Sequence, residues 1–438
     1  MNEQNTDLSE EETGLTEENA DLTPVQEQPG QVAVPAEKVK IRKERNTVRV
    51  KGSPDIPLIV SILILVGFGL AMVYSASFPL AENEYNNSYY YLLRQLAFAA
   101  IGIVVMIVAG TIDYRKYFGK GAPIFFCISF LLLASVPVIG ESHNGAKRWI
   151  GLGAFSFQPT EIMKLALVMM LAWYISKYVH AYRDFDDKTR AIKNKSFIKR
   201  KLSERFPVFI REVAVPFLLV GMVCAITLLE KHLSGTIILF VVGWLVMLWG
   251  RVSLPWLLGI LGGGGVAAWL FATVTGYTSD RITAWLDPYA DELGSGWQII
   301  QGFNAIGSGG LFGVGYTNSI LKRLYLPEPQ NDYIFAIVCE EFGFIGAVLL
   351  IILFALFAWR GFVVAMKAPD SFSRLTAAGI TCKICVQTLL NIFVVTGLFP
   401  PMGISLPFIS YGGTALVILL AECGILISIS RYSRQKKV

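Results

Sequence analysis

The stretch Tyr333–Trp359, YIFAIVCEEFGFIGAVLLIILFALFAW, is an almost unbroken apolar run that carries two adjacent glutamates. Apolar runs of roughly 17–25 residues are long enough to cross about 30 Å of hydrocarbon as a helix. Asp332 stands directly before the run, at the end of the polar segment LPEPQND that begins at Leu326. The sequence therefore predicts a membrane-spanning helix with a carboxylate at its mouth.

The rest of the chain repeats this apolar pattern. Of its 438 residues, 54% are hydrophobic and only 16% are charged, whereas soluble proteins are about a quarter charged. We therefore predict an all-α polytopic membrane protein. Its ten expected transmembrane helices cover residues 56–77, 92–112, 122–139, 160–179, 212–230, 234–250, 254–275, 333–359, 375–398 and 408–430.

The distribution of basic residues predicts the orientation of these helices. With the N-terminus in the cytoplasm, the cytoplasmic segments hold about 28 Lys and Arg residues and the outer segments about seven. Cytoplasmic loops normally carry the excess of Lys and Arg, so both termini are expected inside. The connection 140–160 and the long extracytoplasmic loop 277–332 then lie outside, and Asp332 ends the second of them.

Two cytoplasmic tails are expected to flank a transmembrane domain at 52–431. Residues 1–37 hold ten acidic residues and no Lys or Arg, a composition that cannot bury enough apolar surface to fold. The tail turns basic from Lys38 to Lys51, and a second basic tail covers 432–438. We expect Lys38–Lys51 and the basic loop 188–201 to contact anionic lipid headgroups rather than nucleic acid.

Several common kinds of site are not indicated. All six cysteines lie in apolar runs, where small packing residues are expected, and the three histidines have no metal-ligand spacing. The glycines between Gly307 and Gly315 do not fit a dinucleotide-binding motif, and there is no P-loop. The sequence predicts no metal site and gives no support to ATP-driven transport.

Asp332 allows two interpretations. An aspartate before an apolar helix is a favoured N-cap, because its side chain accepts backbone N–H bonds and suits the helix dipole. A catalytic carboxylate also needs a fixed position, and Pro327 and Pro329 stiffen the approach to Asp332. Taken alone, this residue leaves both interpretations open.

The other unusual outer segment is NGAKRWIGLGAFSFQPTEIMK, residues 144–164. Lys147 and Arg148 next to Trp149 can form an interfacial aromatic belt, or they can recognise an anionic group, since Arg presents a fork of donors to phosphate. Further along, Glu161 and Lys164 are spaced to share a helix face and pair.

Charged residues within the expected spans are costly and should face protein or a wet cavity. Each can belong to an interhelical pair, but together they predict a polar interior that opens to the outer leaflet and accepts an anionic, lipid-linked substrate. These residues are Lys164, Glu340, Glu341, Lys383 and Glu422.

Four stretches together resemble the SEDS family of bacterial cell-wall polymerases, which includes FtsW and RodA, and the last of them is more similar to FtsW. They are NGAKRWIGLGAFSFQPTEIMKLA, RITAWLDPYADELGSGWQIIQGFNAIGSGGLFGVG, YLPEPQNDYIFAIVCEEFGFIGA and NIFVVTGLFPPMGISLPFISYGGTAL. The resemblance covers essentially all of residues 56–430.

The resemblance implies an inverting peptidoglycan glycosyltransferase in the bacterial cytoplasmic membrane. It would polymerise lipid II into β-1,4 glycan strands at the outer face, in cell division or elongation. Asp332 would be the catalytic base, followed by Tyr333 where Phe is usual in the family. The residues implied to bind substrate are Lys147, Arg148, Trp149, Gln158, Glu161, Lys164, Glu328, Ser410 and Tyr411.

The same resemblance implies partners and leaves some alternatives open. A class B penicillin-binding transpeptidase and other division or elongation proteins are the expected partners. The resemblance identifies no definite cofactor, and a divalent cation, Mg²⁺ or Mn²⁺, is an alternative to basic residues for stabilising the leaving group. The segment EKHLSGT, Glu230–Thr236, departs from the family's usual PDLGT. A flippase for lipid-linked precursors and a scaffold without catalysis are the competing functions.

Overall fold

The computed structural model describes residues 47–49, 52–117, 119–143, 146–152, 155–180, 209–274, 276–432 and 435–437. Residues 47–438 form one compact unit. The predicted acidic tail at 1–37 and the predicted basic loop at 188–201 lie outside the described residues.

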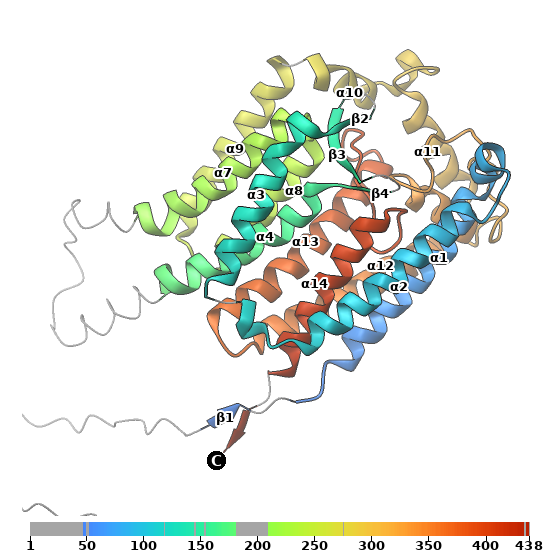
Figure 1. Cartoon of the computed structure of the whole chain (residues 1–438). Helices are drawn as coiled ribbons and strands as arrows, with labels where there is room; N and C mark the ends of the chain where they lie inside the picture. Colours follow the sequence, from blue (N-terminus) through green and yellow to red (C-terminus); the bar gives the residue numbers. More distant parts are fainter. Residues whose placement is uncertain are drawn as a thin grey trace, which may run out of the picture. The chain divides into compact units, whose positions relative to one another are not determined.

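The compact unit is a bundle of long helices with a small sheet at one end (Figure 1). Its principal helices are α1 (Ile56–Tyr85), α2 (Tyr90–Thr111), α3 (Gly121–Ile139), α4 (Pro159–Tyr174), α7 (Val215–Leu229), α8 (Leu233–Trp249), α9 (Leu254–Val274), α12 (Ile334–Met366), α13 (Ser371–Val395) and α14 (Gly413–Arg431). Two π-helical segments, Ile175–His180 and Ile210–Ala214, extend α4 and precede α7.

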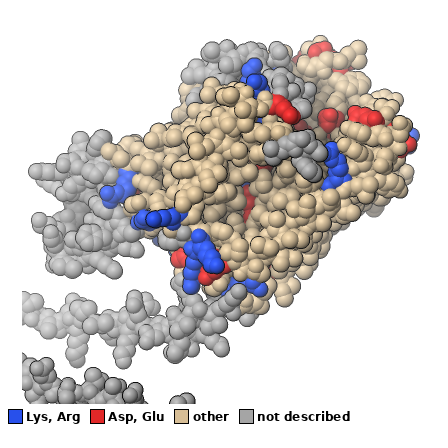
Figure 2. Space-filling model, in the orientation of Figure 1, with Lys and Arg blue, Asp and Glu red and all other residues tan. Residues whose placement is uncertain are grey.

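The predicted all-helical, polytopic fold is confirmed, and each expected span coincides with a helix. In the described part of the chain, eight helices are long and apolar enough to cross a membrane. Of the other two expected spans, α8 is shorter, with 17 residues, and α9 has 21 residues. Figure 2 shows that the visible flank of the bundle is largely uncharged, while basic and acidic residues gather toward its two ends. The chain is therefore a multi-pass membrane protein.

Both connections that were expected to be loops contain regular structure. The 140–160 connection folds into a three-stranded antiparallel sheet of β2 (Glu141–His143), β3 (Ala146–Leu152) and β4 (Phe155–Phe157). The 277–332 segment contains most of α10 (Gly276–Leu286) and all of α11 (Trp297–Ser308). This regular structure was not predicted, because short strands and an isolated amphipathic helix give weak local signals beside long apolar runs.

Helix α12 is broken at Gly343, one third of the way along it. Gly343 has φ 65° and ψ −165°, a conformation that only glycine adopts without strain. The break leaves a short half, Ile334–Phe342, directly after Asp332, and a long half that continues to Met366. Asp332 is therefore joined to the short half.

The backbone groups freed by this break bond to the segment Gly309–Lys322, here called the stitching loop. Val314 N donates to Glu340 O at 2.9 Å and Phe344 N donates to Gly310 O at 2.9 Å. Such pairing is required at membrane depth, where water cannot satisfy backbone groups. The stitching loop thus supplies hydrogen-bond partners for backbone groups that the broken helix leaves unpaired.

Glu340 and Glu341 hold the stitching loop in place. Glu340 accepts hydrogen bonds from Ser319 Oγ and from Ile320 N. Glu341 lies 2.6 Å from Lys322 Nζ in an ion pair whose side chains are both fully buried. The expectation that these glutamates contribute to a polar cavity was wrong for both, because each is satisfied by the loop packed against α12.

Candidate functional site

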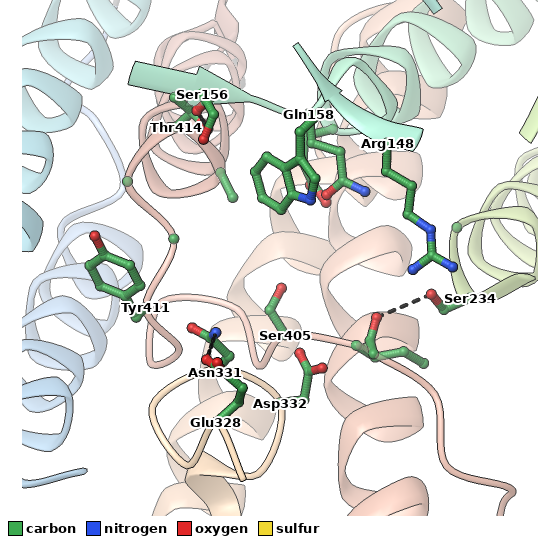
Figure 3. Close-up of a pocket in the computed structure, with 18 of the residues that line it drawn as sticks. Arg148, Ser156, Gln158, Ser234, Glu328, Asn331, Asp332, Ser405, Tyr411 and Thr414 are labelled. Carbon is green, nitrogen blue, oxygen red and sulfur yellow. Dashed lines mark hydrogen bonds between the residues drawn. The ribbon is translucent and has the colours of Figure 1, made fainter. Parts of the chain in front are cut away.

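A cavity of about 570 Å³ lies at the end of the bundle that carries the β2–β4 sheet. Its walls come from segments far apart in the chain: the α1–α2 turn, the β3–α4 segment, the α7–α8 turn, the loop before α12 and the loop between α13 and α14. Figure 3 shows Asp332 and Ser405 on one side of this space and Arg148 and Gln158 on the other.

Asp332 faces the cavity and does not cap α12. The N-cap of α12 is Tyr333, and no side chain caps this end. Within the described part of the chain, no hydrogen bond to the Asp332 carboxylate is present; only its backbone carbonyl is held, by Asn391 Nδ2 at 2.8 Å. The capping interpretation is therefore wrong, and the carboxylate is available to a ligand.

The surroundings of Asp332 raise its proton affinity. Burial, and then the nearby Glu328 carboxylate, raise the pKa of Asp332 to about 6, while Arg281 and Arg148 oppose this rise. A carboxyl group with such a pKa is mostly ionised at neutral pH, yet it binds a proton more readily than an ordinary aspartate. These are the properties of a general base.

Backbone anchors fix the position of Asp332. Asn391 on α13 donates to both Asp332 O and Ile404 O, at 2.8 and 2.6 Å. Ser410 Oγ donates to Asn331 O at 2.6 Å and accepts from Leu406 N at 2.7 Å. Through these two bonds Ser410 joins Asn331, in the loop before α12, to the loop between α13 and α14. Its side chain lines a smaller adjoining cavity rather than the main one. Asn391 could not be singled out from the sequence, because it is one amide in an apolar helix.

Glu328 lies on the rim of the main cavity with Asp332. Its Oε2 accepts hydrogen bonds from Gln330 Nε2 at 3.0 Å and from Asn331 Nδ2 at 2.8 Å. Its φ of 47° is unusual for a non-glycine residue. Glu328 therefore stabilises the tight turn that places Asp332 at the cavity.

The opposite wall carries five of the predicted substrate-binding residues. Arg148, Trp149, Gln158, Glu161 and Lys164 all line the main cavity. The predicted pairing within α4 is confirmed, since Lys164 Nζ lies 2.6 Å from Glu161 Oε1. Lys164 also donates to the α13 amide, Gln387 Oε1, at 3.1 Å.

Two further predicted residues have different positions. Lys147 points away from the cavity, and its Nζ donates to Pro137 O at 3.4 Å. Lys383 pairs with Glu422 at 2.9 Å, joining α13 to α14, and lines the smaller cavity of about 30 Å³.

A third wall is aromatic and was missed from the sequence. The rings of Tyr85 and Tyr90 stack at 3.8 Å between centroids, and Tyr91 meets Tyr411 edge-on at 5.0 Å. Arg94 Nη1 donates to Tyr90 OH at 2.8 Å. Of these residues only Tyr411 was predicted. The run YNNSYYYLLR, residues 85–94, was the available signal.

The α7–α8 turn contributes His232 and Ser234, which were also missed. Ser234 Oγ donates to Gly403 O at 3.1 Å, beside Asp332 (Figure 3). The spacing of the histidines predicted no metal site and no role for His232, yet its ring lines the cavity. The departure from the family pattern at Glu230–Thr236 was the signal that pointed to this turn.

Comparisons with known proteins agree over most of the chain. A family model described as "Cell cycle protein" and labelled for FtsW, RodA and SpoVE matches residues 56–435. Stage V sporulation protein E of Bacillus subtilis (strain 168) is 40% identical over 385 residues, which are 88% of this chain and 99% of that protein. A probable peptidoglycan glycosyltransferase FtsW of Geobacter sp. (strain M18) is 36% identical, with the same coverage.

Solved structures share the fold. A chain from a structure described as "Structural coordination of polymerization and crosslinking by a peptidoglycan synthase complex" matches with a TM-score of 0.67 and 27% identity, covering 87% of this chain and 99% of that chain. RodA of Thermus thermophilus matches with a TM-score of 0.61 and 25% identity, covering 87% of this chain and 98% of its own.

Proposed function

The chain belongs to the FtsW, RodA and SpoVE family, and we propose that the cavity around Asp332 is where it joins lipid-linked disaccharides into glycan strands. The chain is a peptidoglycan glycosyltransferase, as the names of its relatives indicate. The observation that carries the proposal is the unengaged Asp332 carboxylate opposite a basic wall in one cavity. Lipid II, with a sugar hydroxyl and a diphosphate, fits both features.

In the proposed reaction Asp332 is the general base. It removes the proton from the acceptor 4-hydroxyl as that oxygen attacks the anomeric carbon of the donor, and the bond to the lipid diphosphate breaks with inversion. The diphosphate leaves with increased negative charge, which Arg148 and Lys164 are placed to stabilise. Glu161 holds Lys164 in position.

The aromatic wall suits the sugar part of the substrate. Tyrosine rings offer flat apolar faces and a polar hydroxyl, and Tyr85, Tyr90, Tyr91 and Tyr411 present several of them beside the cavity. Trp149 adds a further ring on the opposite side. We propose that the disaccharide lies between these aromatic groups while its reacting atoms face Asp332.

We further propose that the cavity opens on the outer side of the cytoplasmic membrane. The excess of Lys and Arg in the segments at the opposite end of the bundle supports this orientation. A class B penicillin-binding transpeptidase is the proposed partner, since a solved relative is described as part of a complex that coordinates polymerization and crosslinking.

The test of the proposed function is a reconstituted assay that scores two outcomes separately. The purified full chain, in vesicles with lipid II in the outer leaflet, is expected to form glycan strands. Movement of a fluorescent lipid II between leaflets is expected to stay at the rate of protein-free vesicles. Translocation without polymer would favour the flippase, and neither activity, with or without the transpeptidase, would favour the scaffold.

The pKa of Asp332 gives an expected pH dependence. Because burial raises this pKa to about 6, the base form is lost as pH falls through about 6. We expect kcat/KM for lipid II to decrease about tenfold per pH unit below that value. Initial rates between pH 4.5 and 8 measure this, and a flat profile down to pH 4.5 would exclude Asp332 as the titrating base.

Gly403→Ala is expected to impair catalysis without unfolding the protein. A methyl group at Gly403 would lie 3.0 Å from Asp332 Oδ2, so either the carboxylate or the loop must shift. Small misplacements of reacting groups are costly, and we expect kcat to decrease about tenfold. Gly307→Ala is the matched control, since nothing lies within 4 Å of its added methyl group.

For a divalent cation we propose binding that depends on substrate. The described residues hold no group of three or more His, Cys, Asp or Glu side chains suited to a metal. Glu328 and Asp332 line one rim, and Mg²⁺ is commonly held by one or two carboxylates together with substrate phosphates. We expect Mn²⁺ binding, measured by electron paramagnetic resonance, only when a lipid diphosphate is present. Tight binding to the protein alone would contradict this.

A further inference from the structure

Gln95 is a buried amide on the spanning helix α2, and the reaction described above assigns it no role. Its side chain bonds to the backbone on both sides of Tyr411. Gln95 Nε2 donates to Ser410 O at 3.3 Å, and Gln95 Oε1 accepts from Gly412 N at 3.2 Å. Because one partner is a carbonyl and the other an N–H, the orientation of the amide is fixed. Gln95 therefore holds the backbone of Tyr411 from the α2 side.

The loop that carries Asp332 holds the same segment through other bonds. Tyr411 N donates to Gln330 O at 2.9 Å, and Ser410 Oγ donates to Asn331 O at 2.6 Å. Asp332 follows Asn331 directly, and the side chains of Tyr411 and Asp332 both line the main cavity (Figure 3). Residues 410–412 are therefore bonded both to α2 and to the segment that positions the proposed base.

The ring of Tyr411 contacts the same face of α2. Tyr91 lies four residues before Gln95, so the two side chains share a helix face, and the Tyr91 ring meets the Tyr411 ring edge-on at 5.0 Å. Phe98, three residues after Gln95, packs against the loop so closely that a methyl group added at Gly413 would lie 2.1 Å from Phe98 Cδ2. One face of α2 thus fixes both the ring and the backbone of Tyr411.

We propose that Gln95 is a positioning residue that sets where the Tyr411 ring lies relative to the Asp332 carboxylate, and thereby how the sugar part of the lipid-linked substrate fits. The proposal rests on the proposed function, because that function assigns the sugar to the aromatic wall. Gln95 does not line the cavity, so it acts through Tyr411. The basic wall of Arg148 and Lys164 belongs to β3 and α4, so binding of the diphosphate does not depend on Gln95.

Two probes that bind the full-length protein test the proposal without turnover. Lipid II methylated on its acceptor 4-hydroxyl, here called blocked lipid II, carries both sugar and diphosphate and cannot be extended, whereas farnesyl diphosphate carries no sugar. Gln95→Met replaces the amide by an apolar chain of similar length. We expect this change to raise the Kd of blocked lipid II about tenfold, as for lost hydrogen bonds. The Kd of farnesyl diphosphate should stay within about twofold of the parent, as for an independent site.

A double-mutant cycle tests whether Gln95 acts through Tyr411. Tyr411→Leu removes the ring and is expected to raise the Kd of blocked lipid II up to about tenfold. In the Tyr411→Leu protein, Gln95→Met should change that Kd by less than about twofold, because two residues that act through one contact are not additive. A Gln95 that merely stabilised the bundle would have the same effect with or without the ring.

Ser428→Ala is the matched control. Ser428 is buried on α14, and its Oγ donates to Ile112 O, directly after α2, at 2.6 Å. The change therefore removes a hydrogen bond between the same two helices at their other end, and neither Kd should change. Gln95→Glu tests rescue, since a protonated glutamic acid keeps one donor and one acceptor at the same positions. At pH 5 it should bind blocked lipid II within about threefold of the parent.

Four outcomes would overturn the proposal. They are unchanged binding of blocked lipid II in Gln95→Met, an equal loss for farnesyl diphosphate, additive effects with Tyr411→Leu, and equal losses in Gln95→Met and Gln95→Glu. The last comparison also serves if Gln95→Met proves unstable in melting measurements, because a loss in Gln95→Glu at pH 5 alone contradicts the proposal. Failure of the proposed function is distinguishable from these, since it is scored by the absence of glycan strands from unblocked lipid II, which the binding measurements do not require.

Discussion

Asp332→Asn is expected to lower the rate of glycan polymerisation by about 10²- to 10⁴-fold, the range that a positioned general base contributes. The amide has the size of the carboxylate but cannot take the proton of the acceptor hydroxyl. Lipid II should still bind, because Arg148 and Lys164 on the opposite wall are unchanged. Single-turnover polymerisation of labelled lipid II, together with its binding to the variant, separates these two effects.

The same variant should be at least as thermally stable as the parent. The raised pKa of Asp332 means that folding disfavours its ionised form at neutral pH, and a neutral amide avoids this cost. Asp287→Asn, an exposed residue of the same connection, is the control and should retain full activity. Comparable polymer from Asp332→Asn and the parent would remove Asp332 from the mechanism.

Glu341→Gln is expected to destabilise the protein by about 3–5 kcal/mol, as when one partner of a buried ion pair is removed. Lys322 would then be left with an uncompensated buried charge, since both side chains of the pair are inaccessible. Ser75 Oγ, which donates to Glu341 Oε1 at 2.6 Å, would face a neutral amide in place of a carboxylate. Reversible unfolding in mixed detergent micelles measures the change in free energy.

The double variant Lys322→Met with Glu341→Leu should recover most of that stability, because replacing a whole buried pair by apolar residues is often neutral. This variant also tests what the pair is for. If it is stable but polymerises poorly, the pair sets the geometry of the stitching loop. Equal stability of Glu341→Gln and the parent would show that the loop is anchored by its backbone bonds alone.

Much of the fold could be predicted because its determinants are local. An apolar run such as Val348–Ala358 is read directly as a buried or lipid-facing helix. The Glu161–Lys164 pair was predictable for the same reason, since three residues along a helix bring side chains to one face. Because Asp332 directly precedes the apolar run of α12, its carboxylate was also predicted to lie at the start of that helix.

The rest of the site arises from segments that meet only in the folded chain. Tyr91 and Tyr411 are 320 positions apart in the sequence, and nothing in either stretch indicates that their rings touch. Asn391 donates a hydrogen bond to the backbone carbonyl of Asp332. Every residue has such a carbonyl, so the sequence gives no indication of this contact. Glu340 and Glu341 were misread because a glutamate in a span looks the same whether it faces a cavity or a loop.

The break at Gly343 has a consequence for how the enzyme responds to its membrane. Bilayers differ in thickness, and long spans adjust by tilting. A continuous α12 would transmit any such tilt to Asp332 at its end. With the helix divided and the short half fastened to the stitching loop, the 23 residues Phe344–Met366 can lean while the two-turn segment beside the reactive carboxylate stays where it is. We therefore expect the geometry of sugar transfer to depend less on bilayer thickness than it would with a continuous α12.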